Sequence, residues 1–254
     1  MAIKRPRAFV IDFKGDIQAS AVSSLREEIT AVLAVAEDDD EVLIRLESSG
    51  GVVHGYGLAA SQLQRVRNSN IALTVSIDKV AASGGYMMAC IADTIISAPF
   101  ALIGSIGVVA QIPNFHRLLK KNEVDVELIT AGEFKRTLTF FGENTDKGRE
   151  KFAEELEDIH LLFKEFVTEN RPSVSIEEVS TGEAWFGVRA LERQLVDQLK
   201  TSDEYILDLC EERDVFQVQY IVNKNKLERL FDRLTKLGRT RLEEEFNEIS
   251  NFVR

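Results

Sequence analysis

Short apolar runs alternate along the first hundred residues with segments in which apolar residues recur every three or four positions. The runs are rich in β-branched and aromatic residues, as strands are, and the periodic segments are typical of helices. The expected strands cover residues 8–13, 41–46, 71–77 and 94–97, and the expected helices cover 20–36, 56–66 and 86–92. Strands that alternate with helices form parallel sheets with helices on their faces. The pattern therefore predicts an α/β fold with a mostly parallel sheet.

The second half of the chain has a different pattern. One further strand is expected at 124–130, followed by a loop at 131–137. From residue 146 the chain becomes highly charged and helical, with a single apolar face. That face holds Phe152, Leu156, Ile159, Leu162, Phe163 and Phe166.

The last 32 residues form a separate compositional unit. Leu227, Leu230, Phe231, Leu234 and Leu237 lie at helical spacing with Lys and Arg around them, and an acidic stretch follows. Such an amphipathic helix packs on its own domain or on a neighbouring subunit, and contact with a membrane surface is the alternative. The expected organisation is a main domain at 1–222 and a helical C-terminal tail at 223–254.

Composition narrows the classes of function. The 254 residues include 31 Lys and Arg against 42 Asp and Glu, a formal net charge of −11. A nucleic-acid binder needs an excess of cations to displace phosphate counterions, so no nucleic-acid partner is expected. Two cysteines and three histidines, without metal-ligand spacing, argue against a disulfide scaffold and against a metal site. No cofactor is expected.

Residues 94–115 carry no formal charge, as a membrane span would. Their prolines and glycines would break a helix, and their polar side chains would be buried in lipid, so buried strands and turns are expected instead. The basic residues 1–7 lead into an apolar run too short for a signal peptide. The chain as given is therefore expected to carry no export signal.

Two local patterns mimic known site motifs. Gly55-Tyr-Gly57-Leu-Ala-Ala60 mimics a G-x-G-x-x-A dinucleotide fingerprint, but the eight residues 47–54 separate it from the preceding strand, whereas the fingerprint glycines come directly off the strand. Ser76-Ile-Asp-Lys79 matches the S-x-x-K of penicillin-binding enzymes, yet in a strand its two side chains point to opposite faces. Both are interpreted as chance matches.

A third pattern, Ala81-Ala-Ser83-Gly-Gly85-Tyr86, places a serine between a strand and a helix. Unpaired N–H groups at a helix N-terminus favour a developing negative charge, although serine is also an ordinary N-cap. Tandem glycines elsewhere let the backbone present N–H groups to an oxyanion. The other glycine-bounded turns are Ser48-Ser-Gly50-Gly51, Gly104-Ser105-Ile-Gly107 and Gly132-Glu-Phe-Lys135.

Together with Thr181-Gly-Glu-Ala-Trp185-Phe-Gly187 and Leu195-Val-Asp197, these motifs resemble in order those of the serine/lysine signal peptide peptidase family, and most closely its short bacterial SohB-like branch. The resemblance runs from about residue 8 to residue 199. It implies a ClpP/crotonase-like fold, which is a spiral of ββα units. It also implies a serine endopeptidase that cleaves extended apolar peptides such as signal-peptide remnants.

The resemblance assigns roles residue by residue. Ser83 matches the family's nucleophile, and Lys135, 52 residues later, matches its general base. Ser105 matches the serine that helps to hold the lysine. Gly51 and the backbone N–H of Gly84 match the oxyanion hole.

The expected mechanism is attack by Ser83 on a peptide carbonyl while Lys135 takes the proton, after which water releases the acyl-enzyme. A lysine acts as a base near neutral pH only if its pKa falls from about 10.4 by roughly 3 units, which desolvation supplies. The substrate is expected to bind as an added strand. His54, near the glycine turn, has no motif that places a carboxylate beside it and is interpreted as a surface or capping histidine.

The chain departs from the family at two points. Ser49 stands where members usually carry proline, so the φ angle there is not locked. Members usually carry an N-terminal membrane anchor, and none is expected in the chain as given. The expectation is a truncated chain whose catalytic domain belongs in the periplasm, at the bacterial inner membrane, and which contacts the membrane only through that anchor. The family's ring- or dome-shaped assemblies and the apolar tail predict a homo-oligomer of four or eight subunits.

Two other functions remain open at this point. A crotonase-type acyl-CoA enzyme would use the same kind of oxyanion hole but would need neither Ser83 nor the Lys135 loop. The other is a catalytically silent scaffold that binds peptides or partner subunits, and the departure at Ser49 leaves this function open.

Overall fold

The computed structural model describes residues 5–221. The chain divides into two compact units, and the first of them is Met1–Gln219. The tail at 223–254 lies outside the described residues, so the division into a main domain and a helical tail stays a prediction.

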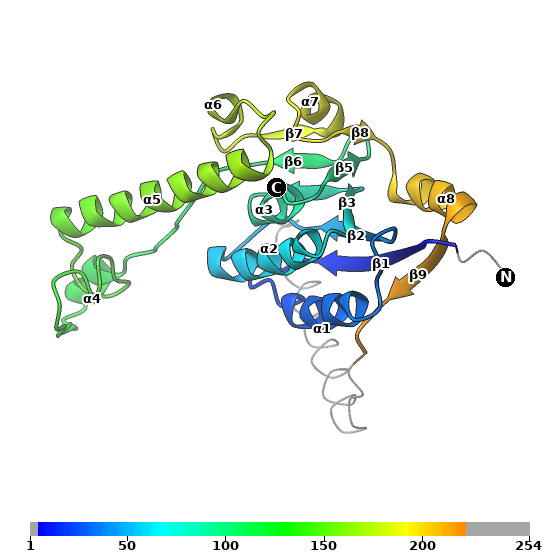
Figure 1. The fold of residues 1–254 in the computed structure, drawn as a ribbon. Coiled ribbons are helices and arrows are strands. Elements are labelled where there is room, and N and C mark those ends of the chain that lie inside the picture. Colours follow the sequence, from blue (N-terminus) through cyan, green and yellow to red (C-terminus); the bar gives the residue numbers. More distant parts are fainter. Residues whose placement is uncertain (1–4, 222–254) are drawn as a thin grey trace, which may run out of the picture. The chain divides into compact units, whose positions relative to one another are not determined.

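A six-stranded sheet forms the centre of this unit (Figure 1). Its order is β8-β5-β3-β2-β1-β9, and every neighbouring pair is parallel. The strands are β1 (Arg7–Lys14), β2 (Glu41–Glu47), β3 (Ala72–Ile77), β5 (Thr94–Ser97), β8 (Gln198–Leu199) and β9 (Asp214–Val218). Central strands such as β2 are buried on both faces, which explains their continuous apolar runs. The predicted α/β fold with a mostly parallel sheet is confirmed.

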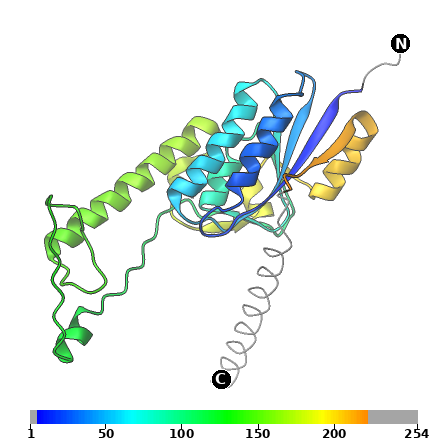
Figure 2. The ribbon, with the colours of Figure 1, turned by 90° about the horizontal axis from the view of Figure 1, so that it is seen from below.

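Helices cover both faces of the sheet. Figure 2 shows α1 (Val22–Leu33) and α2 (Val53–Asn68) on one side and α8 (Ser202–Glu212) on the other. The main core, on the first side, also includes α3 (Gly84–Ala89). On the second side a smaller cluster forms around Leu43 and Leu209. The short strand β8 and the strand β9 form the two edges of the sheet.

A second, three-stranded sheet lies beside the first. It consists of β4 (Val80–Ala82), β6 (Leu102–Gly104) and β7 (Ala184–Phe186), with β4 and β6 parallel and β7 antiparallel. The helices α6 (Ile176–Val179) and α7 (Gly187–Glu192) flank β7 in the chain. The order β3-β4-α3 is one ββα unit of the expected spiral. It brings the chain to Ser83, between β4 and α3.

The 25-residue helix α5 (Asp146–Asn170) extends beyond the sheet, and the short α4 (His116–Lys121) lies near its far end (Figure 1). The Thr145 hydroxyl caps α5 by accepting from the Gly148 N–H. At the other end, the buried Arg171 guanidinium makes two hydrogen bonds to the carboxylate of Asp197. This contact gives Asp197 a structural role. Among the described residues, no helix is long and apolar enough to cross a membrane.

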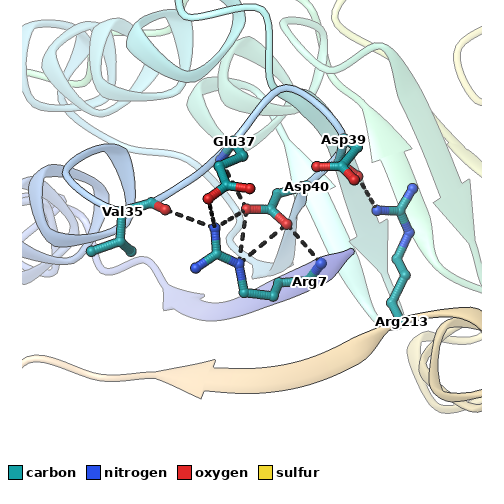
Figure 3. Close-up of polar contacts among 6 residues, drawn as sticks. All are labelled: Arg7, Val35, Glu37, Asp39, Asp40 and Arg213. Carbon is teal, nitrogen blue, oxygen red and sulfur yellow. Dashed lines mark hydrogen bonds and ion pairs between the residues drawn. The ribbon is translucent and has the colours of Figure 1, made fainter. Parts of the chain in front are cut away.

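A second buried carboxylate fixes the start of β1. The Asp40 side chain, 2% exposed, accepts hydrogen bonds from the Arg7 guanidinium and from the backbone N–H groups of Arg7 and Glu37 (Figure 3). Burial raises the pKa of Asp40, but these hydrogen bonds and the Arg7 charge outweigh burial, and the net pKa is lowered. The charged form of Asp40 is therefore the form that stabilises the fold.

This carboxylate predicts an acid-dependent loss of stability. Because its pKa is lower in the folded than in the unfolded state, Asp40 contributes fully above its unfolded pKa of about 4, and the contribution is lost as the pH falls through the folded value. We expect Asp40→Asn to lower the free energy of unfolding at pH 7 and to flatten its decline below about pH 4. Urea unfolding at several pH values measures both. Asp39→Asn is the matched control. It removes a neighbouring carboxylate but keeps the Asp39 backbone carbonyl, which is the group that accepts a hydrogen bond from Arg213. Equal pH dependence in wild type and Asp40→Asn would contradict the assignment.

Candidate active site

Ser83 occupies a sharp turn between β4 and α3. Its φ is +52°, a left-handed conformation that residues other than glycine rarely adopt. Its N–H donates to the Gly104 carbonyl at 2.7 Å, and its own carbonyl accepts from the Met87 N–H at 3.0 Å. The surrounding hydrogen bonds therefore hold a costly conformation, which is a common feature of functional turns. The Ser83 hydroxyl makes no hydrogen bond to any described residue.

The glycine turn after β2 contacts the Ser83 turn directly. Gly50 has a φ of +86°, and a Cβ there would lie 2.8 Å from both Ser83 Cβ and the Gly84 nitrogen. A Cβ on Gly51 would lie 2.2 Å from the Ile17 carbonyl oxygen. A side chain at Gly50 would push the turn away from Ser83, and one at Gly51 would push it away from Ile17. The tandem glycines are therefore needed for the close approach of the two backbones.

Ser105 belongs to a third segment at the same place. It follows Gly104, the acceptor of the Ser83 N–H, and has a φ of +51°. Its own N–H donates to the Glu183 carbonyl at 2.6 Å. The structure thus brings Ser83, Gly84, Gly51 and Ser105 to one groove, although they come from three separate motifs.

The groove has a volume of about 1010 Å³ and a largely apolar lining. One wall is formed by the turns around Ser83, and α5 forms another with Phe152, Leu156, Ile159, His160 and Phe163. The sequence pattern predicted the apolar face of this helix but not its place beside Ser83. Leu162, predicted on that face, is instead 57% exposed. It lies one position from Phe163, which is buried against the core.

Lys135 does not line the groove. It is exposed, in a loop where its N–H donates to the Gly132 carbonyl at 3.2 Å. The same loop is attached to the first turns of α5, since Glu133 pairs with Lys147 and the Phe134 ring lies 5.6 Å from the ammonium groups of Lys147 and Lys151. The predicted nucleophile and the predicted base are therefore not together in the described chain.

The strand predicted at 124–130 is not formed, so that prediction was wrong. Val124, Val126 and Leu128 are 47%, 43% and 52% exposed. The alternation of apolar and polar residues is typical of a strand, but a strand also needs a neighbour to pair with, and no described strand lies beside this segment. The longer segment 109–141, which contains these residues, is also uncovered: its exposed apolar residues include Val109, Phe115, Leu118, Ile129, Phe140 and Phe141.

The residues of the two patterns interpreted as chance matches do not line the groove. Ser76 is buried in β3, and Lys79 pairs with Glu47 at 3.2 Å. Gly55 and Gly57 lie inside α2, so they do not form a turn off a strand.

The described residues also argue against other reactive groups. Burial raises the pKa of Cys90 to about 12, which makes this thiol a poor nucleophile. In the described part of the chain, no group of three or more His, Cys, Asp or Glu could hold a metal ion.

Comparison with known proteins identifies the family. The model of Peptidase family S49 matches residues 65–216, and that of its N-terminal region matches residues 2–63. "Probable protease SohB" of Haemophilus influenzae is 60% identical over 226 residues, which cover 89% of this chain and 64% of that protein. The protein of the same name from Buchnera aphidicola is 61% identical over 231 residues, covering 91% of this chain and 69% of that protein. The chain thus spans about two thirds of the length of these curated relatives.

A solved structure shares the fold. It is a mutant of the 1510-N membrane-bound stomatin-specific protease in complex with a substrate peptide, with a TM-score of 0.55 and 13% sequence identity. The match covers 92% of this chain and 100% of that chain. It agrees with the ClpP/crotonase-like spiral expected from the motifs. With two family models that together match most of its length and relatives near 60% identity, the chain belongs to peptidase family S49.

Proposed function

We propose that this chain is the catalytic part of a serine peptidase in which Ser83 is the nucleophile and Lys135 is the general base. The observation that carries the proposal is the Ser83 turn. It holds a serine in a left-handed conformation at the start of α3, in contact with the Gly50–Gly51 turn, at the edge of an apolar groove. Membership of a peptidase family supports the same chemistry.

The reaction would begin with attack of Ser83 Oγ on the peptide carbonyl carbon. The hydroxyl proton passes to the lysine amine, and the carbonyl oxygen takes the negative charge. Backbone N–H groups of Gly51 and Gly84 would stabilise that oxyanion, since both residues border the groove beside Ser83. Collapse of the intermediate releases the amine product with a proton from the lysine. Water then cleaves the acyl-enzyme by the same steps.

The groove favours an extended, apolar peptide as substrate. The α5 wall offers Phe152, Leu156 and Ile159, which would contact hydrophobic side chains of such a peptide. Backbone hydrogen bonds along an unpaired edge would hold it in an extended form. Signal-peptide remnants and other membrane-derived fragments have this character.

Lys135 must reach Ser83 for the proposal to hold. A general base must lie within hydrogen-bond reach of the proton that it takes, and Lys135 lies in an exposed loop outside the groove. The apolar residues exposed between 109 and 141 would be covered in an assembly. We therefore propose a homo-oligomer in which a second copy of the chain supplies Lys135 to the groove and buries the segment 109–141.

The cellular setting is proposed from the resemblance. An N-terminal anchor like that of the family members would attach the full protein to the bacterial inner membrane, with this domain in the periplasm. Fractionation of the full-length protein with the inner membrane would support this part, and recovery in the cytoplasmic fraction would contradict it.

A catalytically silent scaffold is the second candidate, because Lys135 lies outside the groove. Labelling of the serine decides between the two. We expect a serine-directed acylating probe to modify wild-type protein once, at Ser83, as located by mass spectrometry of peptides. Ser83→Ala should remove the label, whereas Ser49→Ala, at an exposed serine of the same groove, should keep it. An unlabelled wild type, with no peptide hydrolysis, would favour the scaffold.

A further inference from the structure

A chain of buried hydroxyl groups lies directly beneath the glycine turn. Ser48 Oγ and the Tyr56 hydroxyl are 2.6 Å apart, and both residues are buried. The Gly50 N–H donates to Ser48 Oγ at 3.0 Å, and the Tyr56 hydroxyl donates to the Asp16 carbonyl at 2.8 Å. Neither Ser48 nor Tyr56 carries a role in the mechanism above.

The direction of every bond in this chain can be assigned. A backbone N–H only donates and a carbonyl only accepts, and each hydroxyl has one proton. The Tyr56 hydroxyl donates its proton to the Asp16 carbonyl. The Ser48 hydroxyl must therefore donate its own proton to the Tyr56 oxygen, while it accepts a hydrogen bond from the Gly50 N–H. Aligned hydrogen bonds of this kind strengthen one another. Burial raises the pKa of Tyr56, which keeps its proton in place.

The same two residues contact the turn that carries Ser83. A Cβ on Gly84 would lie 2.4 Å from Cγ of the Tyr56 ring, and a Cβ on Gly85 would lie 2.5 Å from the Ser48 carbonyl oxygen. Ser48 is itself fixed to β4, because its N–H donates to the Val80 carbonyl and its carbonyl accepts from the Ala82 N–H. The pair therefore connects the backbone on both sides of the proposed oxyanion hole.

From these contacts we infer that Ser48 and Tyr56 are positioning residues, which hold the Gly50–Gly51 turn at the distance that oxyanion stabilisation requires. The inference rests on the proposed function. A proline at position 49 would restrict this turn by fixing φ. The exposed Ser49 does not, and the hydrogen bond from Gly50 to Ser48 supplies the restriction instead.

Kinetics of Tyr56→Phe test the inference, because this variant keeps the ring against Gly84 and removes only the hydroxyl. We expect kcat for peptide hydrolysis to fall about 10- to 100-fold with KM within about twofold, since the oxyanion exists in the transition state and not in the bound substrate. Affinity for a peptide aldehyde, which forms an oxyanion on the serine, should fall by a similar factor. The pH profile should keep its shape, because the base is not altered.

Tyr86→Phe is the matched control. Tyr86 is also fully buried, and its hydroxyl also donates to a backbone carbonyl, that of Leu195 at 3.0 Å. The Tyr86→Phe variant should lower thermal stability as Tyr56→Phe does, while its kcat stays close to that of the wild type. If Tyr56→Phe changed kcat no more than Tyr86→Phe does, with wild-type turnover intact, the positioning role would be overturned and the peptidase would stand. A wild type without turnover or serine labelling would overturn the proposed function and the inference together.

A second variant tests the relation to position 49. Ser48→Ala should lower kcat as Tyr56→Phe does, and adding Ser49→Pro should restore most of the loss. Proline at position 49 would remove no hydrogen bond, because the Ser49 N–H donates to no described residue, and Ser48 is extended in its bridge to Ala81, as a residue before proline must be. A double variant no more active than Ser48→Ala would contradict the claim that Ser48 restricts the glycine turn as a proline at position 49 would.

Discussion

Replacement of Ser83 by alanine is expected to lower kcat for peptide hydrolysis by about a thousandfold or more, and Lys135→Ala by a similar factor. The first variant removes the atom that forms the acyl-enzyme, and the second removes the group that accepts its proton. Both proteins should fold, because Ser83 Oγ bonds to no described residue and Lys135 is exposed. Initial rates on a fluorogenic apolar peptide, together with thermal melts, measure the two effects separately.

Matched variants show whether the loss is specific. Ser76→Ala and Lys79→Ala remove the rival S-x-x-K pair, and both should keep near wild-type turnover. Lys121→Ala removes another exposed lysine from the segment that carries Lys135 and should also be active. Near wild-type turnover in Lys135→Ala would disprove the assigned base, and loss of activity in all the lysine variants would indicate a general effect of charge.

The sequence predicted the inner strands β1, β2, β3 and β5 of the central sheet because they form apolar runs, but it did not predict the edge strands β8 and β9. Val42, Leu43 and Ile44 are each fully buried, so the apolar run is unbroken and easily found. The second sheet was missed, since β4, β6 and β7 have three residues each and show no periodicity. Its geometry depends on long-range pairing, such as the bridge between Ser48 and Ala81, which a local pattern does not contain.

The groove was only partly predictable. Ser83, Gly51 and Ser105 could be found because serines and glycines in tight turns leave a local pattern, and the structure brings those turns together. The α5 wall could not, because an apolar helical face looks the same whether it covers a core or a substrate groove. The strand expected at 124–130 failed for a related reason: alternation records a tendency to pair, and the partner is not in the described chain.

Mixing two inactive variants is expected to restore activity if a second copy supplies the base. In a ring, a site is complete when its serine comes from the Lys135→Ala chain and its lysine comes from a neighbouring Ser83→Ala chain. Random assembly of equal amounts makes about a quarter of the sites complete. Co-refolded or co-expressed variants should therefore reach about a quarter of wild-type turnover, from a starting level near zero.

The controls follow from the same geometry. The double variant Ser83→Ala/Lys135→Ala, mixed with either single variant, leaves every site incomplete and should stay inactive. Light scattering should show an oligomer in each active mixture, and dilution that dissociates it should remove the activity. If the mixture stayed inactive while wild type turned over as an oligomer, Lys135 would have to reach Ser83 within its own chain. In that case the loop that Glu133 and Phe134 hold against α5 would have to detach. Charge reversal at Glu133 would break its ion pair with Lys147 and would then raise the rate of peptide hydrolysis.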